Sequence, residues 1–383
     1  MPVARSLPTP EAEALIELVR ELTEKELAPR AADFEERGEF PREVFRTLGR
    51  AGLLGLPYPE AYGGAEQPYE VYLQCLEELA TGWLAVGLGV SVHTLACFPL
   101  YAYGTEEQKQ KWLPELVGGE LLGAYCLSEP GAGSDAAALS TRAVRQGDEY
   151  VVNGVKAWVT HGGEADFYNL MVRTSDDGAR GISTLLAPAD TPGLRAAAPE
   201  RKMGMKSSTT AQVLLDDARV PADRLLGEEG VGFRIALSAL DGGRLGIAAC
   251  SVGVAQAALS AAVEYAKVRS QFGKAIVDFQ GVAFLLADMA TQVEAARALY
   301  LSAARKRDAE QPYGRDAAMA KLFASDTAMR VTTDAVQVHG GYGYVTEYPV
   351  ERYMREAKVL QIVEGTNQVQ RLVISRSLVK DGV

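Results

Sequence analysis

The feature that most constrains the fold is a change of sequence pattern near residue 122 and again near residue 225. Between these points lie short runs rich in β-branched and aromatic residues, separated by Gly, Pro and Asp, at 150–158, 168–173, 182–187 and 211–215. Such runs are typical of strands. Before residue 122, Leu15, Leu18, Val19 and Leu22 keep the spacing of one buried helix face. After about residue 231 the chain carries long Ala-rich stretches without internal proline, as packed bundle helices do. We therefore predict a mainly α chain with an inserted β domain: an N-terminal helical domain (1–121), a central β domain (122–225) and a C-terminal helical bundle (226–383).

Two local signals refine this outline. Thr9-Pro10 followed by Glu11 and Glu13 has the capping residue, first-turn proline and acidic first turn of a helix N-terminus. Asn153-Gly154 lies between the apolar runs 150–152 and 155–158. Because Asn-Gly suits the two positive-φ positions of a type I′ turn, the sequence predicts a β-hairpin there.

Charge and hydropathy exclude some partners. The chain has 50 acidic against 39 basic residues, a net charge of −11, which disfavours binding to nucleic acid. We see no window approaching the roughly 18 apolar residues of a membrane span, and therefore expect no membrane insertion. The N-terminus has no hydrophobic signal core, so we expect a cytoplasmic protein, or an organelle matrix protein in processed form.

The candidate chemistry is restricted by what the chain lacks. Its four cysteines form no CxxC pair, and its three histidines are scattered, so we predict no metal site and no disulfide framework. GxSxG is also absent. The chemistry is therefore expected to depend on a carboxylate or a bound cofactor.

Three segments are candidates for that chemistry: the Gly-rich run 125–135, the Trp-hydroxyl run 157–160, and Glu364 within 362–368. Taken singly, each has a plainer explanation, namely a turn, a core aromatic and an acid ahead of a helix. Gly131-x-Gly133-x-x-Ala136 also fits a loose dinucleotide fingerprint. No βαβ unit surrounds it, and the position about 20 residues later, where an acid would bind the ribose, is occupied by Asn153-Gly154, so we reject a Rossmann site.

Taken together, the motifs resemble those of the acyl-CoA dehydrogenase family, over essentially the whole chain and in family order. The matching segments are YCLSEPGAGSD, NGVKAWVT, KMGMKSSTTAQVLLDDARVP, LDGGRLGIAA, RSQFGK, DFQ, VQVHGGYGYVTEYPVER and IVEGTNQVQR. The resemblance implies a helical domain, a β domain and a C-terminal four-helix bundle, in agreement with the order predicted above. It also implies a homotetramer that binds FAD and passes electrons to an electron-transferring flavoprotein.

The resemblance implies a cofactor site in three parts. The first would hold the flavin ring and pyrophosphate, the second would reach the FAD of a neighbouring subunit, and the third would complete the site. These residues are Tyr125, Leu127, Ser128, Gly133, Ser134, Trp158, Val159 and Thr160 for the first part, Arg269, Phe272, Gln280, Gln337, Gly340 and Gly341 for the second, and Thr366 and Gln368 for the third.

For the substrate, the resemblance implies an acyl-CoA bound by Ser134, Asp241, Arg244 and Gly365. Asp241 and Arg244 are three residues apart on a helix, so an ordinary intrahelical ion pair is the plainer explanation for them. Glu364 would take the α-proton while the β-hydride goes to flavin N5, giving the trans-2-enoyl-CoA. The N–H of Glu364 would help to stabilise the developing enolate.

One position separates Glu364 from a family alternative. Isovaleryl-type relatives place the base within the segment that matches LDGGRLG, where this chain has Gly243. Glycine cannot act as a base, which favours Glu364. Three alternatives stay open: an acyl-CoA oxidase that uses O2, a branched short-chain acyl-CoA dehydrogenase of amino-acid breakdown, and a helical scaffold without activity. The C-terminal segments look most like short-chain, butyryl-type relatives.

Overall fold

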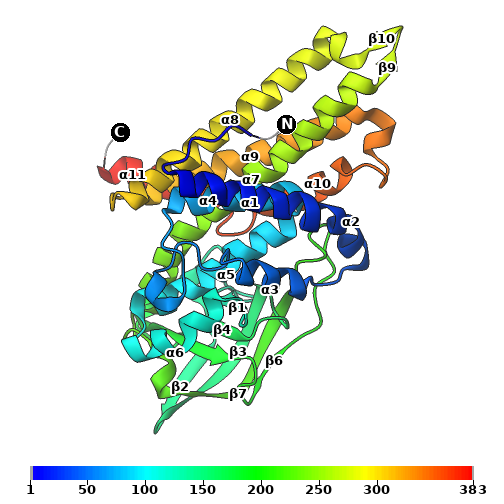
Figure 1. The fold of residues 1–383 in the computed structure, drawn as a ribbon. Coiled ribbons are helices and arrows are strands. Elements are labelled where there is room, and N and C mark those ends of the chain that lie inside the picture. Colours follow the sequence, from blue (N-terminus) through cyan, green and yellow to red (C-terminus); the bar gives the residue numbers. More distant parts are fainter. Residues whose placement is uncertain (1–2, 382–383) are drawn as a thin grey trace.

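The computed structural model describes residues 3–381, so the outermost ends of the first and third predicted domains (1–2 and 382–383) lie outside the described residues. A helical layer is followed by a β sheet and then by long helices, which confirms the predicted mainly α fold with an inserted β domain (Figure 1). The N-terminal helices are α1 (Pro10–Leu22), α2 (Ala28–Arg37), α3 (Arg42–Arg50), α4 (Tyr69–Gly82), α5 (Leu84–Tyr103) and α6 (Glu106–Val117). The predicted cap of α1 is present, since Thr9 Oγ1 accepts a hydrogen bond from the N–H of Ala12.

The β sheet lies below the helices in Figure 1 and has the strand order β6-β7-β3-β2-β4-β5-β8, with β1 parallel to β4. Its inward-facing side chains form a core of their own, which includes Tyr150, Val152, Leu170 and Leu185. The strands are β1 (Gly123–Cys126), β2 (Arg142–Gln146), β3 (Glu149–Thr160), β4 (Phe167–Arg173), β5 (Ile182–Pro188), β6 (Leu194–Ala196), β7 (Thr210–Pro221) and β8 (Leu225–Leu226).

The predicted hairpin at Asn153-Gly154 is wrong. Strand β3 runs straight through these residues, and its pairing with β7 shifts register between Val152 and Gly154, which marks a β-bulge. The amide of Asn153 exchanges two hydrogen bonds of 2.9 Å with Asp217 of β7. A Cβ on Gly154 would stand 2.7 Å from the Cα of Thr141, so this position accepts only glycine. The Asn-Gly dipeptide thus suits a β-bulge as well as a hairpin turn. The pairing of β3 with β7, which is distant in the sequence, selects the bulge here.

The C-terminal part is built on three long helices that lie side by side at the top of Figure 1. They are α7 (Gly232–Val268), α8 (Gln280–Asp308) and α9 (Gly314–His339), followed by α10 (Val350–Ala357) and α11 (Asn367–Asp381). A short hairpin of β9 (Ser270–Gln271) and β10 (Lys274–Ala275) joins α7 to α8. Small buried alanines such as Ala255, Ala304 and Ala324 allow these helices to pack closely in one large core that also takes in α4 and α5.

The expectation that no segment is apolar enough to span a membrane is also wrong. Within the described residues, α5 and α7 are long and apolar enough by length and composition. Their most apolar windows are 89% and 72% buried against the rest of the protein. Both helices therefore bury their apolar surface in the protein core. Packing within the protein accounts for their high hydropathy, and no membrane is needed to explain it.

Candidate active site

Trp158 is held out from the β sheet by a second bulge in β3. The pairing with β7 shifts between Lys156 and Val159, and Trp158 has a φ of 61°. As a result, its indole is 66% exposed while the neighbouring Val159 is buried. An uncovered indole at the end of a strand provides a flat apolar surface, and bulges commonly re-aim a side chain in this way.

The Gly-rich loop lies directly beside this strand end. The N–H of Ala157 donates to the carbonyl of Ser128 at 2.9 Å, so the loop and the strand carrying Trp158 are joined. Glu129 anchors the loop through its carboxylate, which accepts from the buried Lys156 at 2.8 Å and from the N–H groups of Ser140 and Thr141. Burial alone would raise the pKa of Glu129, but Lys156 and these donors lower it to about 2.

The loop leaves open space for a ligand at its tip. A Cβ on Gly131 or Gly133 would meet no atom within 4 Å, and Ser134 is exposed. Of the other predicted cofactor residues here, Tyr125 donates its hydroxyl hydrogen to the carbonyl of Ala236 on α7. Open backbone, an exposed hydroxyl and the uncovered indole fit a ligand with a flat ring and a phosphate group. The structure therefore brings the first part of the predicted cofactor site together.

Glu364 lies between α10 and α11, with its carboxylate turned inward. Its Oε2 is shielded from solvent and has no hydrogen-bond partner among residues 3–381. Burial raises the pKa of Glu364 to about 7, and the charges of Arg244 and Lys321 lower it from a still higher value. A carboxyl group with a pKa near 7 is suited to accept a proton at neutral pH.

The backbone at Glu364 is held in an unusual conformation. Its φ is 55°, and Gly365 follows with a φ of 86°. The side-chain amide of Gln370 donates to the carbonyls of both residues, at 3.0 and 2.8 Å, and Lys321 donates to the carbonyl of Gly365 at 2.9 Å. Non-glycine residues at positive φ are strained and often mark functional sites. Within the described chain, the N–H of Glu364 donates no hydrogen bond, so it is free to bind a ligand.

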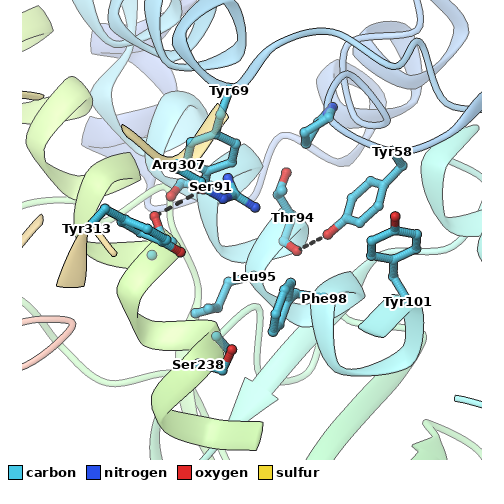
Figure 2. Close-up of a pocket in the computed structure, with 14 residues that line it drawn as sticks. Tyr58, Tyr69, Ser91, Thr94, Leu95, Phe98, Tyr101, Ser238, Arg307 and Tyr313 are labelled. Atoms are coloured by element: carbon cyan, nitrogen blue, oxygen red, sulfur yellow. Dashed lines mark hydrogen bonds between the residues drawn. The ribbon is translucent and has the colours of Figure 1, made fainter. Parts of the chain in front are cut away.

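The carboxylate of Glu364 lies against α7 at Gly243. A Cβ added to Gly243 would stand 2.5 Å from Oε2 and 3.3 Å from Leu95 Cδ1. Gly242, Gly243 and Leu95 also line a cavity, shown in Figure 2, whose other walls combine aromatic side chains with the polar Ser91, Thr94, Ser238 and Arg307. The aromatic wall residues are Tyr58, Tyr69, Phe98, Tyr101 and Tyr313. The carboxylate of Glu364 therefore lies beside a pocket that aromatic and polar side chains line together.

Asp241 and Arg244 form the ion pair expected from their spacing, with Arg244 Nη1 2.6 Å from Asp241 Oδ1. Arg244 is buried, and its Nε has no partner among the described residues. Its charge also lowers the pKa of Glu364. The pair is thus an intrahelical ion pair that in addition acts on the carboxylate.

The second part of the predicted cofactor site lies at a different place, where α7, α8 and α9 end near the β9–β10 hairpin (Figure 1). Arg269, Gly340 and Gly341 line one groove there, with the guanidinium of Arg269 5.7 Å from the ring centroid of Tyr342. Phe272 is 94% exposed, and Gln280 and Gln337 are exposed as well. Of the third part, Thr366 caps α11 by accepting from the N–H of Val369, and Gln368 is exposed.

Comparison with known proteins identifies the family. Three family models match in chain order: the acyl-CoA dehydrogenase N-terminal domain at residues 9–120, the middle domain at 124–218 and the C-terminal domain at 230–379. A short-chain-specific acyl-CoA dehydrogenase of Clostridium acetobutylicum is 45% identical over 96% of this chain and 97% of the relative. The chain belongs to the acyl-CoA dehydrogenase family.

Solved structures agree with this membership. Butyryl-CoA dehydrogenase of Megasphaera elsdenii superposes with a TM-score of 0.96 at 43% identity, over 98% of this chain and 100% of that one. A chain solved in work on the electron-transferring flavoprotein of Acidaminococcus fermentans reaches 0.97 at 45% identity, over 99% and 100%. This acyl-CoA dehydrogenase is therefore an FAD-dependent oxidoreductase that resembles the short-chain, butyryl-type enzymes.

Sequence analysis missed three residues at or near Glu364 and the adjoining cavity of this acyl-CoA dehydrogenase: Lys321, Gln370 and Arg307. A signal for Lys321 was present, because it lies among Ala317, Ala320 and Ala324 on the buried side of α9, where a lysine is out of place. Gln370 and Arg307 carry no such pattern. Their positions depend on how α11 and α8 pack.

Proposed function

We propose that the protein catalyses the FAD-dependent α,β-dehydrogenation of a short straight-chain acyl-CoA to the trans-2-enoyl-CoA, with Glu364 as the base. The observation that supports this most is the buried, unpartnered Oε2 of Glu364 beside the cavity at Gly243. In that position the carboxylate can meet the α-carbon of an acyl group that enters the pocket.

The residues around the cavity supply what this reaction requires. The α-proton of a thioester is too weakly acidic for a carboxylate in water, so the negative charge that develops on the thioester oxygen must be stabilised. The free N–H of Glu364 is a suitable donor for that oxygen. The aromatic walls exclude water and strengthen both interactions. Bound FAD supplies the acceptor for the hydride that leaves the β-carbon.

We propose the cofactor and substrate residues as predicted from the sequence. The first group of cofactor residues fits a flavin because Trp158 is uncovered and the loop at Gly131 and Gly133 is open. We assign Ser134, Asp241, Arg244 and Gly365 to the substrate, with Gly365 next to the base. We also propose that the helical N-terminal, central β and C-terminal helical domains meet at 121/122 and at 225/226.

The second part of the predicted cofactor site, at the β9–β10 hairpin, supports an assembly of several subunits. Arg269 and the glycines at 340 and 341 line one groove, and Phe272 is 94% exposed in the β9–β10 hairpin next to Gln271, which lines the same groove. Since an exposed phenylalanine beside a groove is typical of an interface, we propose that a second copy covers it and that the assembly is a homotetramer. Replacing Phe272 by Asp is expected to lower the mass measured by light scattering.

We propose an electron-transferring flavoprotein as the electron acceptor and the cytoplasm as the location, in line with the bacterial relatives. An acyl-CoA oxidase is the alternative for the acceptor. The two are separated by comparing peroxide yield with the rate of reduction of an electron-transferring flavoprotein.

For the substrate, the bulky side chains of Tyr58, Phe98 and Tyr101 close the pocket, which favours short acyl chains over long ones. Branched short chains are the second choice.

The decisive experiment is Glu364→Gln, measured by anaerobic bleaching of the bound flavin with butyryl-CoA. The amide keeps the size of the side chain but cannot accept the proton, so bleaching should slow by roughly 10³-fold or more while flavin content is retained. Glu351→Gln, which changes a partly buried acid paired with Arg355 on α10, is the matched control and should bleach normally. Normal bleaching by the Glu364 variant would contradict the assignment.

A further inference from the structure

Arg307, near the end of α8, directs a cationic group into the pocket beside Glu364. Figure 2 shows its guanidinium group beside the ring of Tyr69, with the nitrogen atoms toward Thr94. Its Nη1 is shielded from solvent and has no hydrogen-bond partner, and within residues 3–381 no carboxylate forms an ion pair with it. Its guanidinium carbon lies 3.3 Å from the ring centroid of Tyr69, so an aromatic face is its main contact.

The groups around Arg307 are already engaged elsewhere. The adjacent Asp308 accepts hydrogen bonds from the N–H groups of Tyr69 and Glu70, at 2.7 and 3.0 Å, at the start of α4. The Tyr69 hydroxyl donates to the carbonyl of Gly242 at 3.0 Å, and the Tyr58 hydroxyl donates to that of Thr94 at 2.6 Å. None of these neighbours therefore provides a negatively charged group that pairs with the guanidinium of Arg307.

A guanidinium group stays charged at any physiological pH, so it cannot escape this environment by losing its proton. Arg307 as a residue is half-buried, but its Nη1 is shielded from solvent. A shielded charged donor without a partner is costly, and the interaction with an aromatic face recovers only part of that cost. An anionic ligand group would restore the missing hydrogen bonds. Because Gly243 and Arg307 line the same cavity, a ligand whose reacting carbon faces Glu364 would direct its distal end toward Arg307.

We infer that the acyl chain of the preferred substrate ends in a carboxylate, which Arg307 binds. This deepens the proposed function and rests on it. The reaction stays the proposed dehydrogenation. Glu364 would take one α-proton, and bound FAD would supply the acceptor for the hydride from the β-carbon. The product is the 2-enoyl thioester, whose distal carboxylate is intact. Arg307 takes no part in bond breaking and is a specificity residue.

The test compares two thioesters of equal chain length, glutaryl-CoA and pentanoyl-CoA, which differ only in a terminal carboxylate or methyl group. The wild-type holoenzyme should bleach with glutaryl-CoA at a kcat/KM at least about tenfold above that for pentanoyl-CoA. Arg307→Met should lower this ratio roughly 10- to 100-fold, as expected for loss of a charged hydrogen-bonded pair, and Arg307→Lys should restore part of it. Arg305→Met removes an exposed arginine paired with Glu70, two residues away, and should leave the ratio unchanged.

A second readout does not depend on turnover. In a Glu364→Gln background, the affinity for glutaryl-CoA, followed by the change in the flavin spectrum, should fall on Arg307→Met more than the affinity for pentanoyl-CoA does. If both thioesters lose affinity and rate equally, Arg307 has only a structural role and the inference is overturned. An equal preference for both in the wild type overturns it too. If neither thioester bleaches the flavin while butyryl-CoA does, the inference is overturned; if butyryl-CoA fails as well, the proposed function itself fails.

Discussion

Glu364 and Gly243 meet at a point where only one of them can have a side chain. The Oε2 atom of Glu364 lies 2.5 Å from the place that a Cβ on Gly243 would occupy. The two positions are those at which family members are expected to carry the base. Here the glycine leaves the space that the carboxylate fills, so the absence of a side chain at 243 is part of the site.

This contact predicts the effect of Gly243→Ala. The added methyl group must push the carboxylate away from the cavity, and a displacement near 1 Å at a reacting group costs roughly 10²-fold in rate. We therefore expect flavin bleaching by butyryl-CoA to slow about 10²-fold with flavin content retained. Gly281→Ala, on α8, is the control because its Cβ would meet nothing within 4 Å. Bleaching by the Gly243 variant at the control's rate would show that the carboxylate does not act from this position.

Activity should depend on pH through Glu364. Burial raises its pKa to about 7, and the base must be ionised to accept a proton. The kcat/KM for flavin reduction should therefore rise with pH, with a midpoint near 7, and level off above it. Stopped-flow bleaching between pH 5.5 and 8.5 measures this midpoint. A flat profile across that range would exclude a base with so high a pKa.

The same pKa predicts a cost in stability. The pKa of Glu364 is about 7 in the folded protein and 4.5 ordinarily, so the folded state holds the proton more tightly. As pH rises from about 4.5 to about 7, the free energy of unfolding should fall by at most about 3 kcal/mol on account of this group. Glu364→Gln should thus be more stable than the wild type, with a difference that grows up to pH 7 and then stays constant. Denaturant titrations at pH 5 and pH 8 test it, and an equal difference at both pH values would contradict it.

Lys321 is expected to tune the base. Burial lowers its pKa to about 8, while the charges of Glu364 and Asp326 raise it. Because its own charge lowers the pKa of Glu364, Lys321→Met should move the midpoint of the bleaching profile to higher pH. Lys358→Met removes an exposed lysine that contacts Gln361 and should leave the midpoint in place. A variant that loses rate without any shift in midpoint would assign Lys321 a structural role alone.

Trp158 should matter for the flavin and little for the fold. Its ring is mostly exposed, so Trp158→Ala should change the free energy of unfolding of the flavin-free protein by less than about 0.5 kcal/mol. Loss of a stacked ring should weaken FAD binding by up to roughly tenfold, and Trp158→Phe should recover part of it. Flavin fluorescence titration measures the affinity. Val144→Ala, at another exposed apolar residue of the sheet, should bind FAD normally.

Sequence patterns predicted the order of helical and β segments, the cap at Thr9, and the candidate carboxylate at Glu364. These features depend on local periodicity, on capping chemistry or on motifs that stay contiguous along the chain. The hairpin at Asn153-Gly154 failed because the same dipeptide serves a turn or a bulge, and only the pairing with β7 selects between them. The prediction that no segment is apolar enough to span a membrane failed for α5 and α7. Length and composition do not show whether a helix is covered by lipid or by the rest of the protein.

The sequence by itself thus determined the family and the fold class, and it named Glu364 as the acid that we propose as the base. Only the tertiary structure decided what surrounds that acid. The pKa of Glu364 depends on burial and on two charges, Arg244 from α7 and Lys321 from α9, which lie far from it along the chain. Arg307 joins the same pocket from the end of α8. Distances between side chains on different helices arise from packing, and neither periodicity nor local motifs encode them.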